Sequence, residues 1–419
     1  MQKKLIAAAI AGLVAVPALA QTNVTISGRM SEGYENYKLS GTATGTKASA
    51  ENKISDQSSR IRFNAVEDLG NGLQAWGQLE LRANLDNGSL GNLANTNNGN
   101  TGMGLMSKTF GKITLGHWDV HYDEIENNIG GTRAGSLQTN LGNGIMSQVG
   151  RGVRPAVVGG VPGAAPSTSI ANATRTSNLV MWDSPNWNGV TARLAYSTKW
   201  QSVPIADLVN GNLQGDEGTG VRGINGKNPG GGNAWTGAVR YNNGGIAAGL
   251  SYWRANSEDR NCGDALAALP TACGDQRSWR VWGGYTFGFG LKVGLAYDRS
   301  KIKTGFVNNN PKRGAWELPI SYEFGPSKVY LSYARAGKIT GADAVFIDSS
   351  KTKATAWMLG YDYAFSKRTS AGIFYSKLKN NDKVNYNFFG LGSSNATATQ
   401  DGGAGADARQ LYIGVAHNF

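Results

Sequence analysis

The sequence is dominated by a two-residue alternation of apolar and polar side chains, which recurs along almost the whole chain. In the segment LKVGLAYD the apolar positions are Leu291, Val293, Leu295 and Tyr297. The same pattern returns in GVTARLAYS and in WELPISYEF. Because successive side chains of a β-strand point to opposite faces, each such segment predicts a strand with one apolar face and one small, polar or charged face.

The linkers between these segments alternate between short and long. The short ones, such as FGFG, EFGPS and FSKR, suit tight turns, and the long ones are rich in Gly, Asn and Ser. The alternation predicts sixteen strands, which start near residues 22, 53, 72, 102, 112, 174, 188, 233, 244, 277, 289, 313, 327, 352, 368 and 407. An even number of strands, with tight turns at one end and long loops at the other, is typical of an outer-membrane β-barrel.

The two faces of the strands decide which kind of barrel this is. Sixteen strands close into a ring too wide for side chains to fill, so the polar face must line a wet interior. The apolar face must then contact lipid, where closure pairs every backbone group. The sequence therefore predicts an all-β fold: a 16-stranded antiparallel transmembrane β-barrel with short periplasmic turns and long extracellular loops.

Aromatic residues near the strand ends have two alternative roles. An outward aromatic belongs to the belts at the two membrane interfaces, which is the interpretation favoured for Tyr196, Tyr241, Tyr285, Tyr297, Tyr322, Tyr361, Tyr363 and Trp316. An inward aromatic can bind sugars along a channel. The alternation gives Trp118, Trp253 and Trp282 that inward orientation, but they are scattered along the chain.

The first twenty residues have the parts of a secretory signal peptide: two early lysines, an apolar run and the cleavage site Ala18-Leu19-Ala20. A retained anchor helix is the alternative, but the apolar run is shorter than the roughly 20 residues that a span needs. We expect residues 21–419 to form one domain. Removing the two leader lysines lowers the net charge from +12 to +10, and the positive charge is spread out rather than gathered in a tail that would bind nucleic acid.

Four segments carry a family resemblance. SSRIRFNAVEDLGNGLQAWGQLEL (58–81), FGKITLG (110–116), NLVMWDSPNWNGVTARLAYS (178–197) and the closing HNF occur in the order and spacing of the general porins of β-proteobacteria and neisseriae, which the chain resembles. The resemblance implies a homotrimeric, water-filled porin of the outer membrane, without cofactors, that passes ions and small hydrophilic solutes. It also implies that the third long loop, about residues 119–173, folds into the barrel and narrows the pore. The family's Pro-Glu-Phe-Gly-Gly-like loop tip is missing, and Arg62 stands where a Gly is usual.

Charged residues of the predicted pore suggest its selectivity. The alternation places arginines on the inner wall of the early strands, namely Arg29, Arg60, Arg62, Arg82, Arg175 and Arg193. The facing acids are those of the third loop, Asp119, Asp123, Glu124 and Glu126. A basic wall opposite an acidic loop gives a transverse field across the narrowest point, and the excess of positive charge predicts a preference for anions. The alternative is that each arginine pairs with a nearby acid or with a phosphate of lipopolysaccharide.

Two further features concern assembly. Cys262 and Cys273 lie close together in a polar loop, and in an exported protein such a pair is expected to form a disulfide. The last segment, LYIGVAHNF, indicates a strand that ends on Phe419, which we expect to pair with the first strand and close the ring. A terminal aromatic strand of this kind resembles the signal read by the β-barrel assembly machinery.

Two other classes of function remain as alternatives. An outer-membrane enzyme or metal site would need His117 and His121, which have acids beside them in HWDVHYDE. No serine nucleophile motif or H-E-x-x-H accompanies them, so we expect no catalytic residue and no metal. The second alternative is a substrate-selective channel, or an adhesin or phage receptor that uses the long outer loops.

Overall fold

The computed structural model describes residues 23–40, 50–57, 59–90, 99–124, 175–198, 233–256, 275–303, 310–341, 349–384, 386, 388 and 405–419. The strands are β1 (Asn23–Ser40), β2 (Glu51–Asp56), β3 (Arg60–Gly70), β4 (Leu73–Asn84), β5 (Ser89–Leu90), β6 (Thr101–Ser107), β7 (Gly111–Asp119), β8 (Arg175–Asp183), β9 (Val190–Ser197), β10 (Ala234–Asn243), β11 (Ile246–Ala255), β12 (Asp275–Thr286), β13 (Leu291–Lys303), β14 (Lys312–Phe324), β15 (Ser327–Ala336), β16 (Ala354–Ala364), β17 (Thr369–Asn380) and β18 (Asp407–Asn418). Two 3-10 turns, η1 (His121–Glu124) and η4 (Ser349–Lys351), complete the described elements. None of the helical segments in these ranges is long and apolar enough to cross a membrane.

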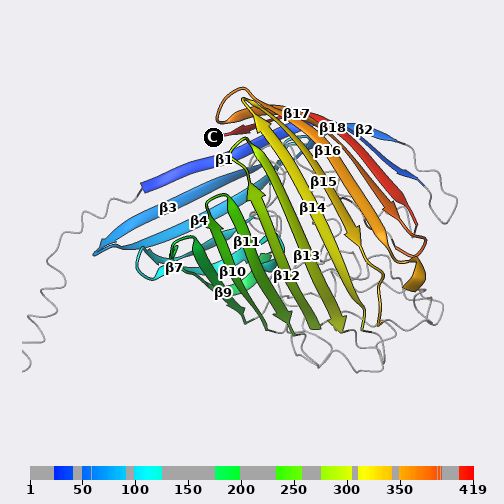
Figure 1. The fold of residues 1–419 in the computed structure, drawn as a ribbon. Coiled ribbons are helices and arrows are strands. Elements are labelled where there is room, and N and C mark those ends of the chain that lie inside the picture. The colour runs from blue at the N-terminus through cyan, green and yellow to red at the C-terminus, as the bar shows by residue number, and fades with distance from the viewer. Residues whose placement is uncertain are drawn as a thin grey trace, which may run out of the picture.

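The strands form one antiparallel sheet that closes on itself (Figure 1). Apart from the short segments β2 and β5, each strand pairs with the next along the chain, and β18 pairs back with β1 from Arg29 opposite Asn418 to Ser40 opposite Asp407. Beyond that register, the backbones of Gly28 and Phe419 exchange hydrogen bonds in both directions, at 2.9 and 3.1 Å. Closure leaves the sheet without a free edge along this seam.

The eighteen strand segments of the described residues occupy sixteen positions around the barrel. β2 and β3 both pair with β1 and share one position, and β5 is a two-residue segment that pairs only with β4. Every predicted strand start lies within two residues of an observed one, and the short connections alternate with the long ones as expected. The prediction of a 16-stranded antiparallel barrel is therefore confirmed.

The second position is interrupted by a bulge. Two residues of β1 lie opposite three residues of the interrupted strand, 57–59. Side chains replace part of the missing ladder, because Ser59 Oγ accepts a hydrogen bond from Ser31 N at 2.9 Å and Asp56 Oδ1 accepts one from Ser59 N at 3.0 Å. An extra residue in one strand reverses the alternation of its side chains.

This reversal determines which residues of the second position face the interior. Before the bulge Ile54 faces outward and is 57% exposed, and after it Phe63 faces outward and is 39% exposed. These two residues have opposite parity in the sequence. The bulge therefore turns Arg60 and Arg62 into the barrel, whereas an uninterrupted strand that starts from Ile54 would point both arginines at lipid.

The outer surface is apolar and carries two levels of aromatic pairs. Close to the long loops, four neighbouring strand pairs each hold a tryptophan against a tyrosine with ring centroids 5.2–5.4 Å apart: Trp235–Tyr252, Trp279–Tyr297, Trp316–Tyr333 and Trp357–Tyr375. Close to the short turns, tyrosines pair with phenylalanines: Tyr285–Phe287, Tyr322–Phe324 and Tyr363–Phe365. Two aromatic levels at the two ends of an apolar wall match the two interfaces of a bilayer.

Candidate pore constriction

On the inner wall of β3 and β4, three arginines surround one glutamate. Glu80 lies opposite Arg62 in the sheet register, and Arg60 lies opposite Arg82. The glutamate oxygens lie 3.7 Å from Arg60 Nη1, 2.5 Å from Arg62 Nε and 3.1 Å from Arg82 Nη2. Because one carboxylate meets three guanidinium groups, this cluster carries a formal excess of two positive charges.

A fourth arginine extends the basic wall onto β1. Arg29 is paired with Arg60 in the register and is only 8% exposed. Its Nη2 atom donates to Ser31 Oγ at 3.4 Å. The arginines predicted for the early strands β1, β3 and β4 therefore lie together on one sector of the inner wall.

A second charged cluster lies on β8, β9 and β10, and it is balanced. Arg193 donates from Nε and Nη2 to the two carboxylate oxygens of Asp183, at 2.6 and 3.1 Å. Glu124 of η1 forms an ion pair with Arg240 and lies 3.7 Å from Arg193 Nη1. Two arginines therefore meet two acids. For Arg193, the structure agrees with the alternative in which an arginine of the wall pairs with a nearby acid.

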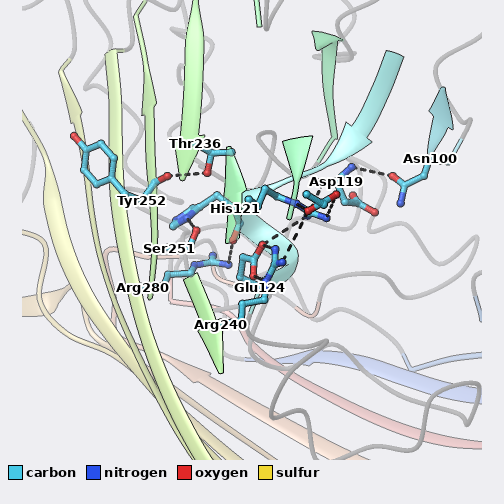
Figure 2. Close-up of polar contacts among 11 residues, drawn as sticks. Asn100, Asp119, His121, Glu124, Thr236, Arg240, Ser251, Tyr252 and Arg280 are labelled. Atoms are coloured by element: carbon cyan, nitrogen blue, oxygen red, sulfur yellow. Dashed lines mark hydrogen bonds and ion pairs between the residues drawn. The ribbon is translucent and has the colours of Figure 1, made fainter. Parts of the chain in front are cut away.

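The start of the third loop docks on the inner wall of β10–β12 through η1 (Figure 2). His121 is fully buried, and its Nδ1 atom lies 2.6 Å from Ser251 Oγ. Arg280 Nη1 donates to the His121 carbonyl oxygen at 3.1 Å, while Arg280 Nε lies 3.6 Å from Asp298 Oδ2. Burial, helped by the Arg280 guanidinium, lowers the pKa of His121 well below its usual 6.5.

The backbone of Asp119 also contributes to this docking. Its amide donates to Asn100 Oδ1 at 2.9 Å (Figure 2). Its carbonyl accepts from Arg193 Nη1 at 3.3 Å. The chain is therefore fixed, where it leaves β7, by Asn100 before β6 and by Arg193 of β9. Residues 125–174 lie outside the described part of the chain, so the third loop beyond Glu124 is not placed.

Several predicted positions fall outside what the structure describes. The side chains of Asp123 and Arg175 and the whole of Glu126 are among them, as are Cys262 and Cys273, so their predicted roles and the disulfide stay predictions. His117 is placed, and its Nδ1 atom lies 2.9 Å from Ser177 Oγ. No cluster of three or more metal-ligating side chains occurs within the described ranges.

The inner wall also holds an aromatic group. Trp76 of β4 and Trp118 of β7 pack edge to face with ring centroids 5.5 Å apart, and Lys112 Nζ lies 3.4 Å from the Trp76 centroid. Trp253 and Trp282, which the alternation also turned inward, are buried. They lie in two separate apolar clusters of the inner wall; Trp118 packs against the one that contains Trp253, whereas Trp282 belongs to the other.

The residues that the sequence reasoning missed are partners of the arginines. Glu80 and Asp183 were not singled out, although both lie on the inward face by the same alternation that placed the arginines. Arg240 was also missed, in the strand AWTGAVRYNN, where the alternation indicates its inward orientation. The alternation shows a residue's face, whereas the identity of its partner depends on the register between strands.

A closed barrel with an apolar outer wall, two aromatic levels and a charged interior is the architecture of a diffusion channel of the outer membrane. Comparison with known proteins agrees. A family model described as Gram-negative porin matches residues 7–383. Since the match covers most of the chain, the chain belongs to the Gram-negative porin family.

Relatives of known name support the same assignment. The chain is 27% identical over 412 residues to an outer membrane porin protein of Bordetella pertussis, covering 91% of this chain and 95% of that protein. It is 27% identical over 382 residues to the major outer membrane protein P.IB of Neisseria gonorrhoeae, covering 88% and 92%. These relatives confirm the resemblance to the porins of β-proteobacteria and neisseriae.

Two solved structures show the same fold. An anion-selective porin from Comamonas acidovorans matches with a TM-score of 0.62 at 19% identity, covering 95% of this chain and 100% of that one. The trimer form of OmpT from Vibrio cholerae matches with a TM-score of 0.55 at 14% identity, covering 95% and 99%. The protein is an outer-membrane porin, and as a member of this family it is a passive channel and not an enzyme.

Proposed function

We propose that this porin passes small hydrophilic solutes with a preference for anions, and that the arginines of β1, β3 and β4 set this preference. The observation that carries the proposal is the sharing of Glu80 by three arginines: these four side chains together carry a formal charge of +2. Arg29 adds a further charge beside Arg60. Low-dielectric walls focus such a field on the water between them and raise the local concentration of anions.

The balanced cluster on β8–β10 supports a one-sided field. There Arg193 and Arg240 are matched by Asp183 and Glu124, so this sector contributes little net charge. A permeating ion therefore meets a positive sector on β1–β4 and a neutral sector where η1 docks. The Comamonas porin is anion-selective, but a likeness at 19% identity shows the fold alone. The proposal thus rests on the charges of this chain.

The test is the reversal potential of single channels in a salt gradient. The double variant Arg60→Ser, Arg62→Ser removes two charges from the cluster and is expected to move the reversal potential towards cation preference. The matched control is Arg299→Ser, Arg409→Ser, which removes two exposed arginines whose alternation places them on the outer wall. A reversal potential that stays at the wild-type value in the inner-wall variant refutes the assignment.

We further propose that the channel is a homotrimer with β1 and β2 at the subunit interface. The outward face of these strands carries polar groups where lipid would require apolar ones: Tyr34 Oη donates to Asn52 Oδ1 at 2.8 Å, and Asn36 Nδ2 donates to the same oxygen at 2.6 Å. Chemical cross-linking of the purified protein is expected to give products up to three copies. Products that end at one or two copies contradict the trimer.

The remaining partners follow from the location in the outer membrane. We propose that residues 1–20 act as a signal peptide for export, that the barrel assembly machinery reads the strand ending at Phe419, and that lipopolysaccharide surrounds the outer rim. Export and assembly precede conduction, so a defect in either lowers the amount of protein in the membrane and leaves the properties of each inserted channel unchanged. This difference separates assembly variants from pore variants.

A further inference from the structure

The inner wall has an apolar region that a water-filled channel does not explain. Inward alanines follow one another at the long-loop ends of four strands, β14–β16 and β18: Ala315, Ala334, Ala336, Ala354, Ala356 and Ala408. All of them are buried, at 0–2% exposure. Small apolar side chains on the wet face of a barrel wall gain nothing from facing water, so a second layer must cover them.

That second layer contains the first part of the connection after β17. Three alternate residues of this segment, Val384, Tyr386 and Phe388, are buried at 0%, 1% and 6% exposure. They belong to the same apolar cluster as the inward alanines. These three residues, which we call the inner strap, therefore lie against the inner wall, with their side chains in the cluster that contains the alanines.

One side chain clamps the inner strap. Asn380, inward at the end of β17, accepts a hydrogen bond from Tyr386 N at 3.1 Å and donates from Nδ2 to Tyr386 O at 2.9 Å. The same Nδ2 atom donates to Ala406 O, where the chain returns to β18. The carboxamide offers an acceptor to the N–H and a donor to the C=O of the same residue, which neither the carboxylate of Asp nor the side chain of Leu does.

A second contact carries the inner strap away from its own strand. The Arg313 guanidinium of β14 lies 5.1 Å from the centre of the Tyr386 ring, and Arg313 is only 2% exposed. β14 lies three strand spacings from β17, which is about 14 Å at the usual 4.7–4.9 Å per strand. The Tyr386 backbone is held at Asn380 of β17, so its ring reaches from there towards Arg313, over β15 and β16.

We propose that the inner strap is a second constriction of the channel, separate from the third loop, which sets the channel's conductance and the size of solutes it admits. η1 covers the inner wall at β10–β12, and the inner strap covers it at β14–β17. Of the described residues, neither η1 nor the inner strap covers the sector that carries Arg60 and Arg62. The inference concerns the width of the path and does not rest on the proposed anion preference.

The test compares variants that widen and narrow the path. The double variant Tyr386→Ala, Phe388→Ala is expected to raise single-channel conductance and to admit larger neutral sugars into proteoliposomes, with the reversal potential unchanged. Tyr386→Trp is expected to lower conductance. The matched control, Trp357→Ala with Tyr375→Ala, removes a ring pair from the outer wall of β16 and β17 and should leave conductance at the wild-type value.

Folding is controlled separately. Asn380→Leu removes the clamp and keeps every ring, so it is expected to raise conductance and its fluctuations while the barrel still inserts. Conductance at the wild-type value in inserted channels of both Tyr386→Ala, Phe388→Ala and Asn380→Leu overturns the proposal. A shifted reversal potential with unchanged conductance would likewise overturn it, because the strap would then act on charge and not on width.

Discussion

Replacing Glu80 by glutamine tests the charge balance of the inner wall. Glu80 is almost fully buried and is the shared partner of Arg60, Arg62 and Arg82. Glutamine keeps the shape of the side chain but removes its charge, so the excess of the cluster rises from two positive charges to three. The variant is therefore expected to become more anion-preferring than the wild type, which is the opposite of what loss of the arginines does.

The size of the effect follows from screened Coulomb interaction. The Coulomb energy between the carboxylate and a monovalent ion about 6 Å away in water is about 0.7 kcal/mol. Salt with a Debye length of about 8 Å reduces this energy to about 0.3 kcal/mol. Anions gain and cations lose this amount, so the ratio of their permeabilities changes by about 0.65 kcal/mol, or roughly threefold. Three guanidinium groups without their carboxylate also repel one another, and breaking a buried ion pair costs about 3–5 kcal/mol of stability.

The assay is the reversal potential in a tenfold salt gradient, with the thermal stability of the folded barrel measured in parallel. Glu67→Gln is the matched control, since it removes the same charge from the outward side of the neighbouring strand β3. The double variant Glu80→Gln, Arg82→Gln restores the excess of two and is expected to return the permeability ratio towards the wild-type value. A ratio in Glu80→Gln that equals the control's, or that shifts towards cations, refutes the reasoning.

Two further predictions concern assembly and the loop root. Deleting Phe419 removes the backbone pairing with Gly28 and should lower the yield of inserted protein while single-channel conductance stays normal; a normal yield contradicts it. Burial and the Arg280 guanidinium hold the pKa of His121 well below 6.5. The docked loop therefore binds fewer protons than a released loop, in which His121 has its ordinary pKa. Docking is then expected to weaken as the pH falls from 7 towards and through the lowered pKa. His121→Gln, which can still bond Ser251 but cannot be charged, should abolish acid-induced changes in channel closure. An acid response equal to that of the wild type counts against this role.

Much of the fold was predictable because its signals are local. Strand starts were predicted to within two residues, since the two-residue alternation and the turn residues depend only on neighbours along the chain. The bulge at 57–59 was not predicted. The alternation within β2 and within β3 does not show that the interrupted strand has one more residue than β1 opposite it. The faces of Arg60 and Arg62 were still predicted as the structure has them, because they were inferred from the alternation of their own segment, SRIRFNAV.

The partners of the charged residues were less predictable. The sequence indicated that the acids facing the arginines belong to the third loop, but the acid that meets three of them is Glu80, on the neighbouring wall strand. Of the loop acids whose side chains are described, Glu124 meets two arginines, one of which is Arg240. Ion pairs across a sheet depend on register, which the alternation of a single strand does not contain.

The inner strap shows how a signal can be present in a sequence and still be interpreted incompletely. The alternation predicts inward residues that are small, polar or charged. This description fits Ala315, Ala356 and Ala408 as well as it fits the inward arginines. Small apolar residues and charged residues nevertheless have different consequences, because only the latter suit contact with water. A run of inward alanines together with the alternating apolar residues of VNYNFF therefore predicts a covering segment before any contact is known. Applied to other porins, the same comparison of inward alanines with alternation in the long loops would identify which loops fold into the barrel.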